Sequence, residues 1–315
     1  MMVENNQQPL VSVAVIAYNS SATVLETLES IYNQTYPNIE LIISDDCSTD
    51  NTLDVCRKWL CSHEQRFSST RIIVSGANTG VTGNCQRVWE SCGTEWLKFI
   101  AADDVLFPNC IDDNMNFVAQ HIDAQCVFSK VEVIGIPKED GELFCKSRYD
   151  YSFFEMSPKE QYEKILPWCS IPIVTAFLNN KNLREIGLNF DTRIPMLEDR
   201  PFYLNAIAAG VRFDLLDKQT VGYRVHPNSL CNVPILSPKF YESTQLTNFF
   251  YYFAYYYQKD PDSAIREIVS REMRVYNEYY NLKMDSLTKS YKIYKCLSHP
   301  SRIFKRIKKC FIKNN

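Results

Sequence analysis

Glycine is scarce in this chain, and the glycine-rich loops that often hold nucleotide phosphates are missing. Only 9 of the 315 residues are glycine. No segment matches the GxxxxGK[ST] phosphate loop, and no GxGxxG pattern follows a predicted strand. These absences argue against a P-loop enzyme and against an NAD-dependent dehydrogenase.

Long apolar runs are also missing. No stretch approaches the roughly 20 apolar residues that a helix needs to cross a bilayer. Residues 1–9 lack the apolar core of a secretory signal, so we expect no signal peptide. The sequence therefore predicts a protein that works in the cytoplasm.

The cysteines lack any paired arrangement. The chain has 12 of them, but they are scattered, without a CxxC pair and without acids or histidines at zinc-site spacing. We interpret them as thiols in a reducing compartment and not as a disulfide framework.

Short apolar runs alternate with segments of helical periodicity through the first half of the chain. Apolar residues make up 45% of the sequence, enough for a sizeable core. This rhythm predicts an α/β fold with a mostly parallel sheet covered by helices on both faces. The expected strands are residues 11–17, 41–43, 71–75, 96–101 and 126–134.

The rhythm loosens after about residue 140. Further strands are predicted at residues 173–178, 211–216 and 220–225, and a helix at 201–209. From Pro238 onward the pattern is helical. We therefore expect one domain over residues 1–230 and a helical C-terminal extension over 231–315.

Polar side chains follow four of the predicted strands. In an open parallel sheet, ligands bind beyond the carboxyl ends of the strands, so these side chains should share one rim. Paired carboxylates favour a hard divalent cation such as Mg²⁺ or Mn²⁺. The alternative is that each Asp only begins a turn or caps a helix. The segments are Ala17-Tyr18-Asn19, Asp45-Asp46, Asn78-Thr79-Gly80 and Asp103-Asp104.

Read together and in order, these segments resemble glycosyltransferase family 2, from about Leu10 to Ser229. Residues 11–19 are similar to the opening strand of the family, and residues 30–37 to its "S…Q.YP" helix end. The segment ELIISDDCSTD at residues 40–50 resembles the "E.I.VDDGSTD" block, with Cys47 in place of the usual glycine. FIAADD at residues 99–104 resembles the metal-binding DxD-type motif.

The resemblance implies a GT-A fold and a nucleotide-sugar donor, most simply a UDP-sugar. Asp46, beside Asp45, is expected to bind the nucleotide base through its ring N–H. Asp104 is expected to ligate the metal, and Asp103 to hold the ribose or sugar of the donor. The remaining donor-binding residues that it implies are Ala17, Tyr18 and Asn19 at the base and ribose, and Asn78 and Gly80 where the backbone approaches the donor.

Two later blocks also match the family. Glu198-Asp199 resembles the "ED" element that supplies the catalytic base of an inverting transfer, with Asp199 as the base and Glu198 in reserve. Either acid is alternatively explained by the favourable dipole at a helix start. Residues 223–229 resemble a "YR.H..S" block, so Arg224 is expected to clamp the diphosphate and His226 to contact the metal or a phosphate. We interpret Lys98 and Arg87 as solvated or structural.

The tail from Pro300 is basic and amphipathic. Its cations interleave with apolar residues at helical spacing, which suits an anionic membrane surface. A solvated, frayed tail is the alternative. Peripheral contact with the inner face of the cell membrane would fit a glycan acceptor carried on a lipid, as in bacterial surface polysaccharide synthesis. The net charge of −3 decides nothing about nucleic acid, but nothing outside the tail is basic, so we expect no nucleic-acid partner.

Three other classes compete with a glycosyltransferase. A sugar nucleotidyltransferase would want a glycine-rich basic loop, which residues 11–20 lack. A glycoside hydrolase also uses paired carboxylates but needs no nucleotide pocket. A non-catalytic sugar-nucleotide or carbohydrate-binding protein would keep the pocket and lose the base.

Overall fold

The computed structural model describes residues 8–225, 238–260 and 262. The chain divides into two compact units, residues 1–233 and 234–315, and each is described by itself. All predicted site residues except His226 belong to described segments of the first unit. His226 lies outside the described residues.

A single mixed sheet forms the centre of the first unit. Its strand order is β3-β2-β1-β4-β7-β6-β8-β5. Neighbours β3-β2, β2-β1, β1-β4 and β6-β8 run parallel, whereas β7 and β5 pair antiparallel to their neighbours. The predicted mostly parallel α/β sheet is therefore confirmed. The strands are β1 (Val11–Ala17), β2 (Ile39–Asp45), β3 (Ser69–Val74), β4 (Trp96–Ala101), β5 (Val105–Leu106), β6 (Cys126–Ile134), β7 (Phe177–Asn179) and β8 (Phe213–Arg224).

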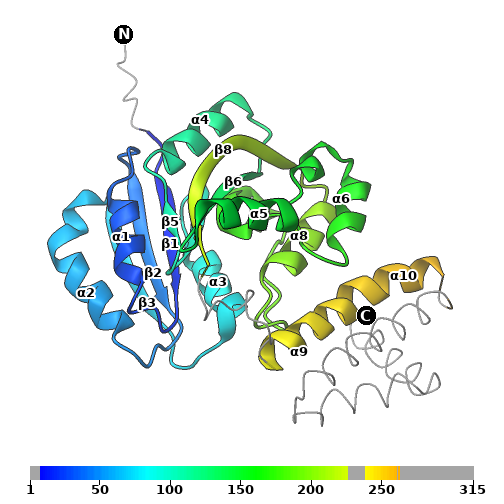
Figure 1. The fold of residues 1–315 in the computed structure, drawn as a ribbon, viewed down its shortest axis with the longest axis horizontal. Coiled ribbons are helices and arrows are strands. Elements are labelled where there is room, and N and C mark those ends of the chain that lie inside the picture. The colour runs from blue at the N-terminus through cyan, green and yellow to red at the C-terminus, as the bar shows by residue number, and fades with distance from the viewer. Residues whose placement is uncertain (1–7, 226–237, 261, 263–315) are drawn as a thin grey trace. The chain divides into compact units, whose positions relative to one another are not determined.

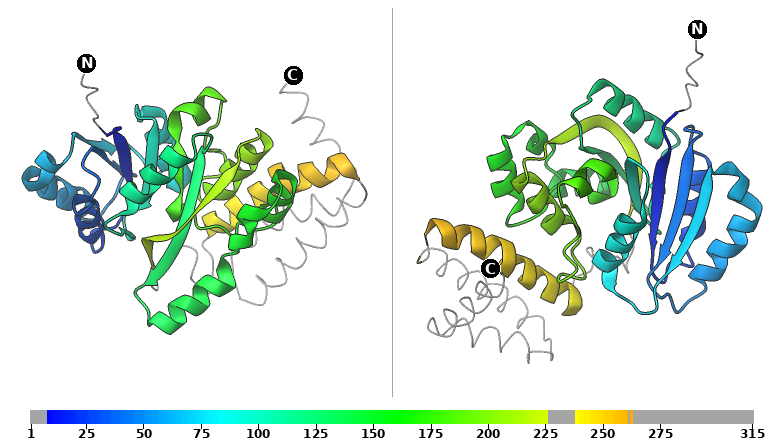
Figure 2. Two further views of the ribbon diagram at one scale, coloured as in Figure 1. Left: turned by 90° about the horizontal axis from the view of Figure 1, so that it is seen from above. Right: turned by 180° about the vertical axis from the view of Figure 1, so that it is seen from behind.

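Helices cover both faces of this sheet. Figures 1 and 2 show α1 and α2 together on one face of β1–β3 and α3 on the other. The helices of the first unit are α1 (Val24–Tyr32), α2 (Thr52–His63), α3 (Gly80–Ser91), α4 (Cys110–Gln120), α5 (Lys138–Arg148), α6 (Pro158–Ile165), α7 (Asn180–Glu185) and α8 (Asp199–Ala208). Short 3₁₀ turns are η1 (Glu64–Arg66), η2 (Tyr151–Glu155) and η3 (Ile173–Thr175).

The inner strands are apolar because both of their faces are covered. Val11, Val13 and Val15 of β1 are completely buried, and so are Leu41 and Ile43 of β2. Such strands read as continuous runs of β-branched residues and not as alternating ones. This burial fixes the positions of the loops at the carboxyl ends of the strands.

Two predicted strand segments differ in the structure. Residues 173–178 are divided, because η3 occupies Ile173–Thr175 and only Phe177–Asn179 forms β7. The two strands predicted over residues 211–225 are one strand, β8. Its pairing with β6 shifts register near Lys130, so the polar stretch around Asp217 interrupts the apolar pattern without ending the strand.

The second unit is helical where it is described. It contains α9 (Pro238–Thr247), the π-helical η4 (Asn248–Phe253) and α10 (Ala254–Lys259). The predicted amphipathic tail lies outside the described residues. Among the helices that are described, none combines the length and apolar character required to cross a bilayer.

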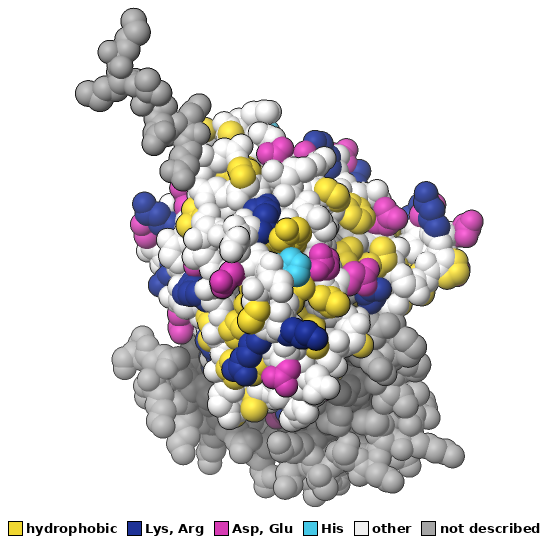
Figure 3. Space-filling model, turned by 90° about the vertical axis from the view of Figure 1, so that its left-hand side faces the viewer, with side chains coloured by type: hydrophobic (Ala, Val, Ile, Leu, Met, Phe, Trp, Pro, Cys, Tyr) yellow, Lys and Arg dark blue, Asp and Glu magenta, His cyan; other side chains and the backbone are white. Residues whose placement is uncertain are grey.

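Charges of both signs are mixed on the face that Figure 3 presents. Lys and Arg side chains alternate there with Asp and Glu, and apolar side chains lie between them. The described residues of this face therefore offer no extended basic patch of the kind that binds a nucleic-acid backbone.

Candidate active site

The loops after β2 and β4 lie on either side of the end of β1. Ala17 pairs with Asp45, and Ile16 pairs with Ala101. Beyond these pairs, the amide of Asp46 donates to the Ala17 carbonyl at 2.9 Å, and the amide of Ala102 donates to the Ile16 carbonyl at 3.1 Å. Both acidic loops therefore leave the sheet at one edge.

Asp45 belongs to the framework of its own loop. Its side chain is buried and accepts hydrogen bonds from the amide and the hydroxyl of Ser48. Cys47 adopts a φ of 64°, a left-handed conformation that glycine reaches with less strain. The glycine usual at this position in the resembling motif therefore has a backbone explanation, and the cysteine keeps the same turn.

Asp46 is fully engaged by the start of α3. Its Oδ2 accepts from the amides of Thr79 and Gly80 at 2.9 and 2.8 Å. Its Oδ1 accepts from the Thr79 hydroxyl at 2.6 Å and pairs with Arg87 at 3.1 Å. These bonds use about all the acceptor positions of a carboxylate. The base contact predicted for Asp46 stays a prediction, and it requires one of these donors to move.

Gly80 is required by a neighbouring loop. Its φ is 81°, and a Cβ placed there would lie 2.3 Å from the carbonyl oxygen of Pro195. Asn78 is exposed, and its Oδ1 accepts from the Gly80 amide at 3.2 Å. The glycine therefore permits close contact between α3 and residues 194–198, whether or not a donor also approaches it.

The residues after β1 divide into buried and exposed members. Ala17 is completely buried, whereas the Tyr18 side chain is 46% exposed. Asn19 is fixed in a left-handed conformation, with its Oδ1 accepting from the Thr49 amide at 2.8 Å and its own amide donating to Ser48. Tyr18 is thus an exposed ring on an ordered loop beside both acidic loops.

Arg224 holds the loop of Asp103 and Asp104. The Arg224 amide donates to Asp104 Oδ1 at 2.7 Å, and its Nε donates to the Asp103 carbonyl at 2.7 Å. A terminal nitrogen of the guanidinium pairs with Glu26 at 2.5 Å. The end of β8 is therefore anchored at this edge, with one terminal nitrogen of Arg224 already committed to a carboxylate.

The carboxyl of Asp104 is almost buried, at 3% exposure. Burial, followed by the charge of Asp103, raises the pKa of Asp104 well above its usual range. Among the described residues, no donor reaches its second oxygen, Oδ2. A cation at this oxygen would relieve both effects, so Asp104 and Asp103 fit a divalent metal.

The described residues supply only part of a metal coordination shell. Nowhere in these segments do three or more His, Cys, Asp or Glu side chains gather closely enough to hold a metal ion. Mg²⁺ and Mn²⁺ are commonly bound by one or two carboxylates together with substrate phosphates. This donor set therefore suits a metal that arrives with a phosphorylated ligand.

Glu198 and Asp199 form a half-buried pair at the start of α8. Burial, with the neighbouring charge of Asp199, raises the pKa of Glu198 to about 8. Burial also raises the pKa of Asp199, but the Arg200 amide, at 2.6 Å, and the Arg200 guanidinium favour its ionised form. The pair therefore keeps a proton near neutrality, and Asp199 is the more readily ionised of the two acids.

Helix α3 connects this pair to Asp46. Thr82 donates to the Pro195 carbonyl at 3.1 Å through its amide and to the Ile194 carbonyl at 2.6 Å through its hydroxyl. Burial raises the pKa of the Cys85 thiol, and the charges of Glu198 and Asp46 raise it further. Both acids therefore lie near the same turn of α3.

Arg87 and Lys98, which we interpreted as solvated or structural, both make contacts within the fold. Arg87 pairs with Asp46. Lys98 is completely buried in β4 and donates to the carbonyls of Val174 at 2.5 Å and Ala176 at 3.3 Å. Burial lowers the pKa of Lys98 to about 8. These contacts join residues far apart in the chain, so nothing in the local sequence could identify the partners.

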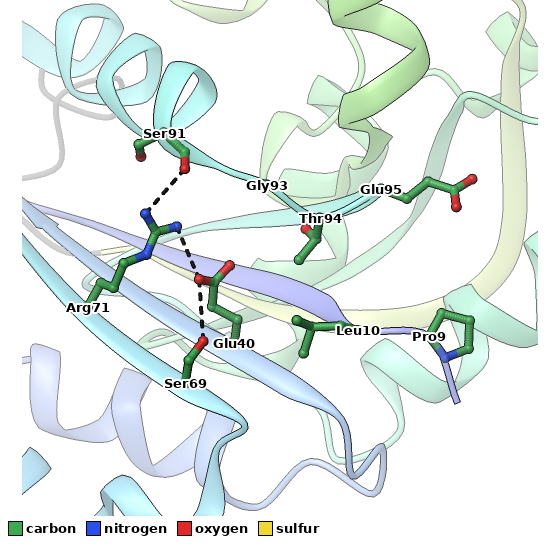
Figure 4. A pocket seen from close by; sticks show the side chains of 9 residues that line it. All are labelled: Pro9, Leu10, Glu40, Ser69, Arg71, Ser91, Gly93, Thr94 and Glu95. Carbon is green, nitrogen blue, oxygen red and sulfur yellow. Dashed lines mark hydrogen bonds and ion pairs between the residues drawn. The ribbon is translucent and has the colours of Figure 1, made fainter. Parts of the chain in front are cut away.

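A hollow of about 670 Å³ lies at the opposite edge of the sheet. Figure 4 shows Arg71 directed toward Glu40 between the amino-terminal parts of the strands. Glu40 pairs with Arg71 at 3.1 Å and accepts from the Ser12 hydroxyl. Its charge is thus satisfied within the fold, and this hollow is separate from the acidic loops.

Comparison with protein families gives one family match and several relatives. The model of "Glycosyl transferase family 2" matches residues 12–181. A UDP-Glc:α-D-GlcNAc-diphosphoundecaprenol β-1,3-glucosyltransferase of Escherichia coli is 27% identical over 70% of this chain and 79% of its own length. A putative teichuronic acid biosynthesis glycosyltransferase of Bacillus subtilis is 24% identical over 71% of this chain and 82% of its own length.

Solved structures of S. aureus TarS share the fold. TarS 1–349 in complex with UDP-GlcNAc superposes with a TM-score of 0.60 at 21% identity, over 76% of this chain and 66% of that chain. In another TarS structure the match covers 39% of that chain. The expected GT-A-type arrangement is therefore confirmed.

Proposed function

Because the chain belongs to glycosyl transferase family 2 and is a glycosyltransferase, we propose that it moves a sugar from UDP to a hydroxyl of a lipid-linked or free glycan, with inversion at the anomeric carbon. The observation that carries this proposal is the Glu198–Asp199 pair, held beside α3 with raised pKa values. Catalytic bases are often carboxyls whose pKa is raised in this way.

The donor half of the site is the edge formed by the loops after β1, β2 and β4. The exposed Tyr18 ring offers a face on which the base stacks, with Ala17 and Asn19 completing that wall. Asp46 and Asn78 shape the start of α3, where Gly80 brings the backbone close. A UDP-sugar is supported by the donor named for the E. coli relative and by UDP-GlcNAc in the TarS complex.

Asp104, with Asp103 beside it, would hold Mn²⁺ or Mg²⁺ through the oxygen that no described donor reaches. When bound there, such an ion neutralises charge on the departing diphosphate. Arg224 keeps the two carboxylates in place and brings a guanidinium to the same position. His226 remains the proposed further contact to metal or phosphate.

Asp199 acts as the general base. It accepts the proton of the acceptor hydroxyl while that oxygen forms its bond to the anomeric carbon. The bond between that carbon and the diphosphate oxygen breaks at the same time, and UDP leaves with the electron pair. Burial raises the pKa of Glu198 to about 8, so Glu198 is the acid that holds the proton near neutrality and Asp199 is left to accept one.

A lipid-linked acceptor is supported by the names of the relatives and fits the basic tail predicted after Pro300. Such a tail would contact an anionic membrane from its inner face. The acceptor named for the E. coli relative carries GlcNAc on a diphosphate lipid.

The direct test is UDP release. Purified protein is incubated with UDP-Glc, UDP-GlcNAc or UDP-Gal and Mn²⁺, with and without a GlcNAc-α-diphosphate that carries a short alkyl chain. We expect slow UDP release without the acceptor, faster release with it, and loss of both in EDTA. No release and no ligand-induced thermal shift with any nucleotide sugar would contradict the proposal.

A further inference from the structure

Trp168 is unlike the other tryptophans of this chain. The chain has four, and three are almost buried, at 5% (Trp59), 0% (Trp89) and 6% (Trp96) exposure. Trp168 is 57% exposed, and within the described part of the chain its ring stacks on no other aromatic ring. Trp168 therefore presents an open indole face that a ligand can reach.

The residues on either side of Trp168 lie beside the start of α8, next to Asp199 and Arg200. The carbonyl of Pro167 accepts from Arg200 Nη1 at 2.7 Å. The Cys169 thiol donates to the Ile171 carbonyl at 3.7 Å, and Cys169 and Asp199 lie close enough that each shifts the pKa of the other, the thiol favouring the ionised carboxylate. Neighbouring Cα atoms are about 3.8 Å apart, so the backbone of Trp168 lies one residue from the side chain that shifts the pKa of Asp199.

The segment that carries Trp168 is fixed at several points. The Asp150 amide donates to the Ser170 carbonyl at 3.0 Å, and Lys98 donates to the Val174 carbonyl at 2.5 Å. Lys98 belongs to β4, the strand that ends in the Asp103–Asp104 loop, so the same strand positions both parts of the site. A ring on a fixed segment loses little conformational freedom when it binds a ligand.

From these contacts we infer that Trp168 is the platform on which the sugar ring of the acceptor stacks, with the attacking hydroxyl directed at Asp199. This inference rests on the proposed function, since it requires Asp199 to be the base. A pyranose has an apolar face of C–H groups that fits the face of an indole. Ligand sites commonly combine such an aromatic face with a few fixed polar groups. Trp168 would therefore select cyclic, sugar-bearing acceptors over simple alcohols.

Tryptophan fluorescence tests binding without any need for turnover. Because the other three indoles are almost buried, a sugar that stacks on the surface changes mainly the emission of Trp168. The wild-type protein is titrated with methyl glycosides of glucose, galactose and N-acetylglucosamine. We expect a saturable change with at least one glycoside and none in W168F. No change with any glycoside, or an equal change in W168F, overturns the inference.

Kinetics with the GlcNAc-diphosphate acceptor then separate positioning from chemistry. W168A should raise the KM for the acceptor about ten-fold, the equivalent of about 1.4 kcal/mol, and more than it raises the KM for the donor. W168F keeps a ring and should recover most of the affinity. The control is I122A, which truncates a side chain that is 88% exposed on the turn after α4. An acceptor KM that is the same in W168A and I122A contradicts the inference.

The two failures are distinguishable. If the wild-type protein releases no UDP from any donor but a glycoside still changes Trp168 emission, the proposed transfer fails and the sugar platform stands. If UDP is released and transferred while W168A and W168F match the wild-type protein, the transferase stands and the platform fails.

Discussion

The acidic pairs of this site differ in how far the protein itself satisfies them. Asp46 accepts from two amides and a hydroxyl and pairs with an arginine, and Asp45 accepts twice from Ser48. Glu198 and Asp199 are half-buried with raised pKa values, and the Arg200 amide donates to Asp199 at 2.6 Å. Asp45 and Asp46 after β2 therefore have the contacts of structural residues. Glu198 and Asp199 at the start of α8 have the properties expected of catalytic residues.

This difference separates acidic residues that stabilise the fold from acidic residues that take part in binding or catalysis. A carboxylate whose acceptor positions are filled from within stabilises the fold and is costly to remove. A carboxylate that burial keeps partly protonated can change its protonation state when it binds a ligand or accepts a proton. Variants of the two pairs should therefore divide into losses of stability and losses of activity.

The largest expected effect is on turnover, in Asp199→Asn. The amide keeps the size of the side chain but cannot accept the acceptor proton, so kcat should fall about 10³-fold. The melting temperature should stay within about 2 °C of the wild-type value, since Asn also accepts from the Arg200 amide. Initial rates of UDP release with acceptor, together with calorimetry, measure both. Glu198→Gln serves as the matched control and should keep most of the activity. Unchanged turnover in Asp199→Asn would remove the base assignment.

Asp46→Asn should reduce the stability of the fold and not the rate of the chemical step. It removes the charge that pairs with Arg87 and turns an NH₂ group toward N–H donors, which should cost about 3 kcal/mol. Urea denaturation measures this loss. The control is Asp50→Asn, in which an exposed acid of the same loop loses its bonds to Thr52 and Ser21. That change should cost under about 1 kcal/mol. Equal losses in both variants would contradict the distinction drawn here.

Local sequence predicted the architecture well where the strands are buried on both faces. The bounds of β1, β4 and β6 agree with the apolar runs at residues 11–17, 96–101 and 126–134, because such strands carry a continuous apolar signal. Helix α5 was missed, since most of its residues are polar and exposed and only Gly141 is buried. The division of residues 173–178 was also missed, because a lysine from another strand holds η3.

The candidate site was predictable only as a set of positions. Strand ends indicated the acidic loops, but the donors that fill Asp46 come from α3, more than 30 residues later in the chain. The indole of Trp168 gave no signal, because its importance depends on Pro167 and Cys169 meeting Asp199 and Arg200 in space. Such contacts cannot be inferred from spacing.

Gly80→Ala tests whether the start of α3, which holds Asp46, also positions the Glu198–Asp199 pair. The left-handed backbone penalises alanine, and its Cβ would meet the Pro195 carbonyl, so the loop before Glu198 must shift. Gly210→Ala is the control, because its φ is 85° and its surroundings are open. Both variants should lose about 1 kcal/mol to backbone strain, and Gly80→Ala about 1 kcal/mol more. Only Gly80→Ala should also lose activity, about ten-fold, because it displaces the base. Equal kcat values in the two variants would break this connection.

The smallest expected effect is a change in the pH dependence of stability. The folded pKa of Glu198 is about 8, above its ordinary 4.5, so the folded state binds more protons between these values. Its contribution to stability is therefore complete below pH 4.5 and is lost as the pH rises through 8. Glu198→Gln removes this loss and should gain stability relative to the wild-type protein between pH 5 and pH 8. The two pKa values set an upper limit of about 3.5 kcal/mol on this gain, and solvent screening of the half-buried pair should reduce it to about 1 kcal/mol. Urea denaturation of both proteins across this range measures the difference.

The control is Glu160→Gln, which lies in an exposed helix cap. Hydrogen bonds from Ser157 lower the pKa of Glu160, so the dependence of stability on pH should have the opposite sign there. A Glu198→Gln curve parallel to the wild-type curve would mean that the pair ionises as freely as the acids at the protein surface.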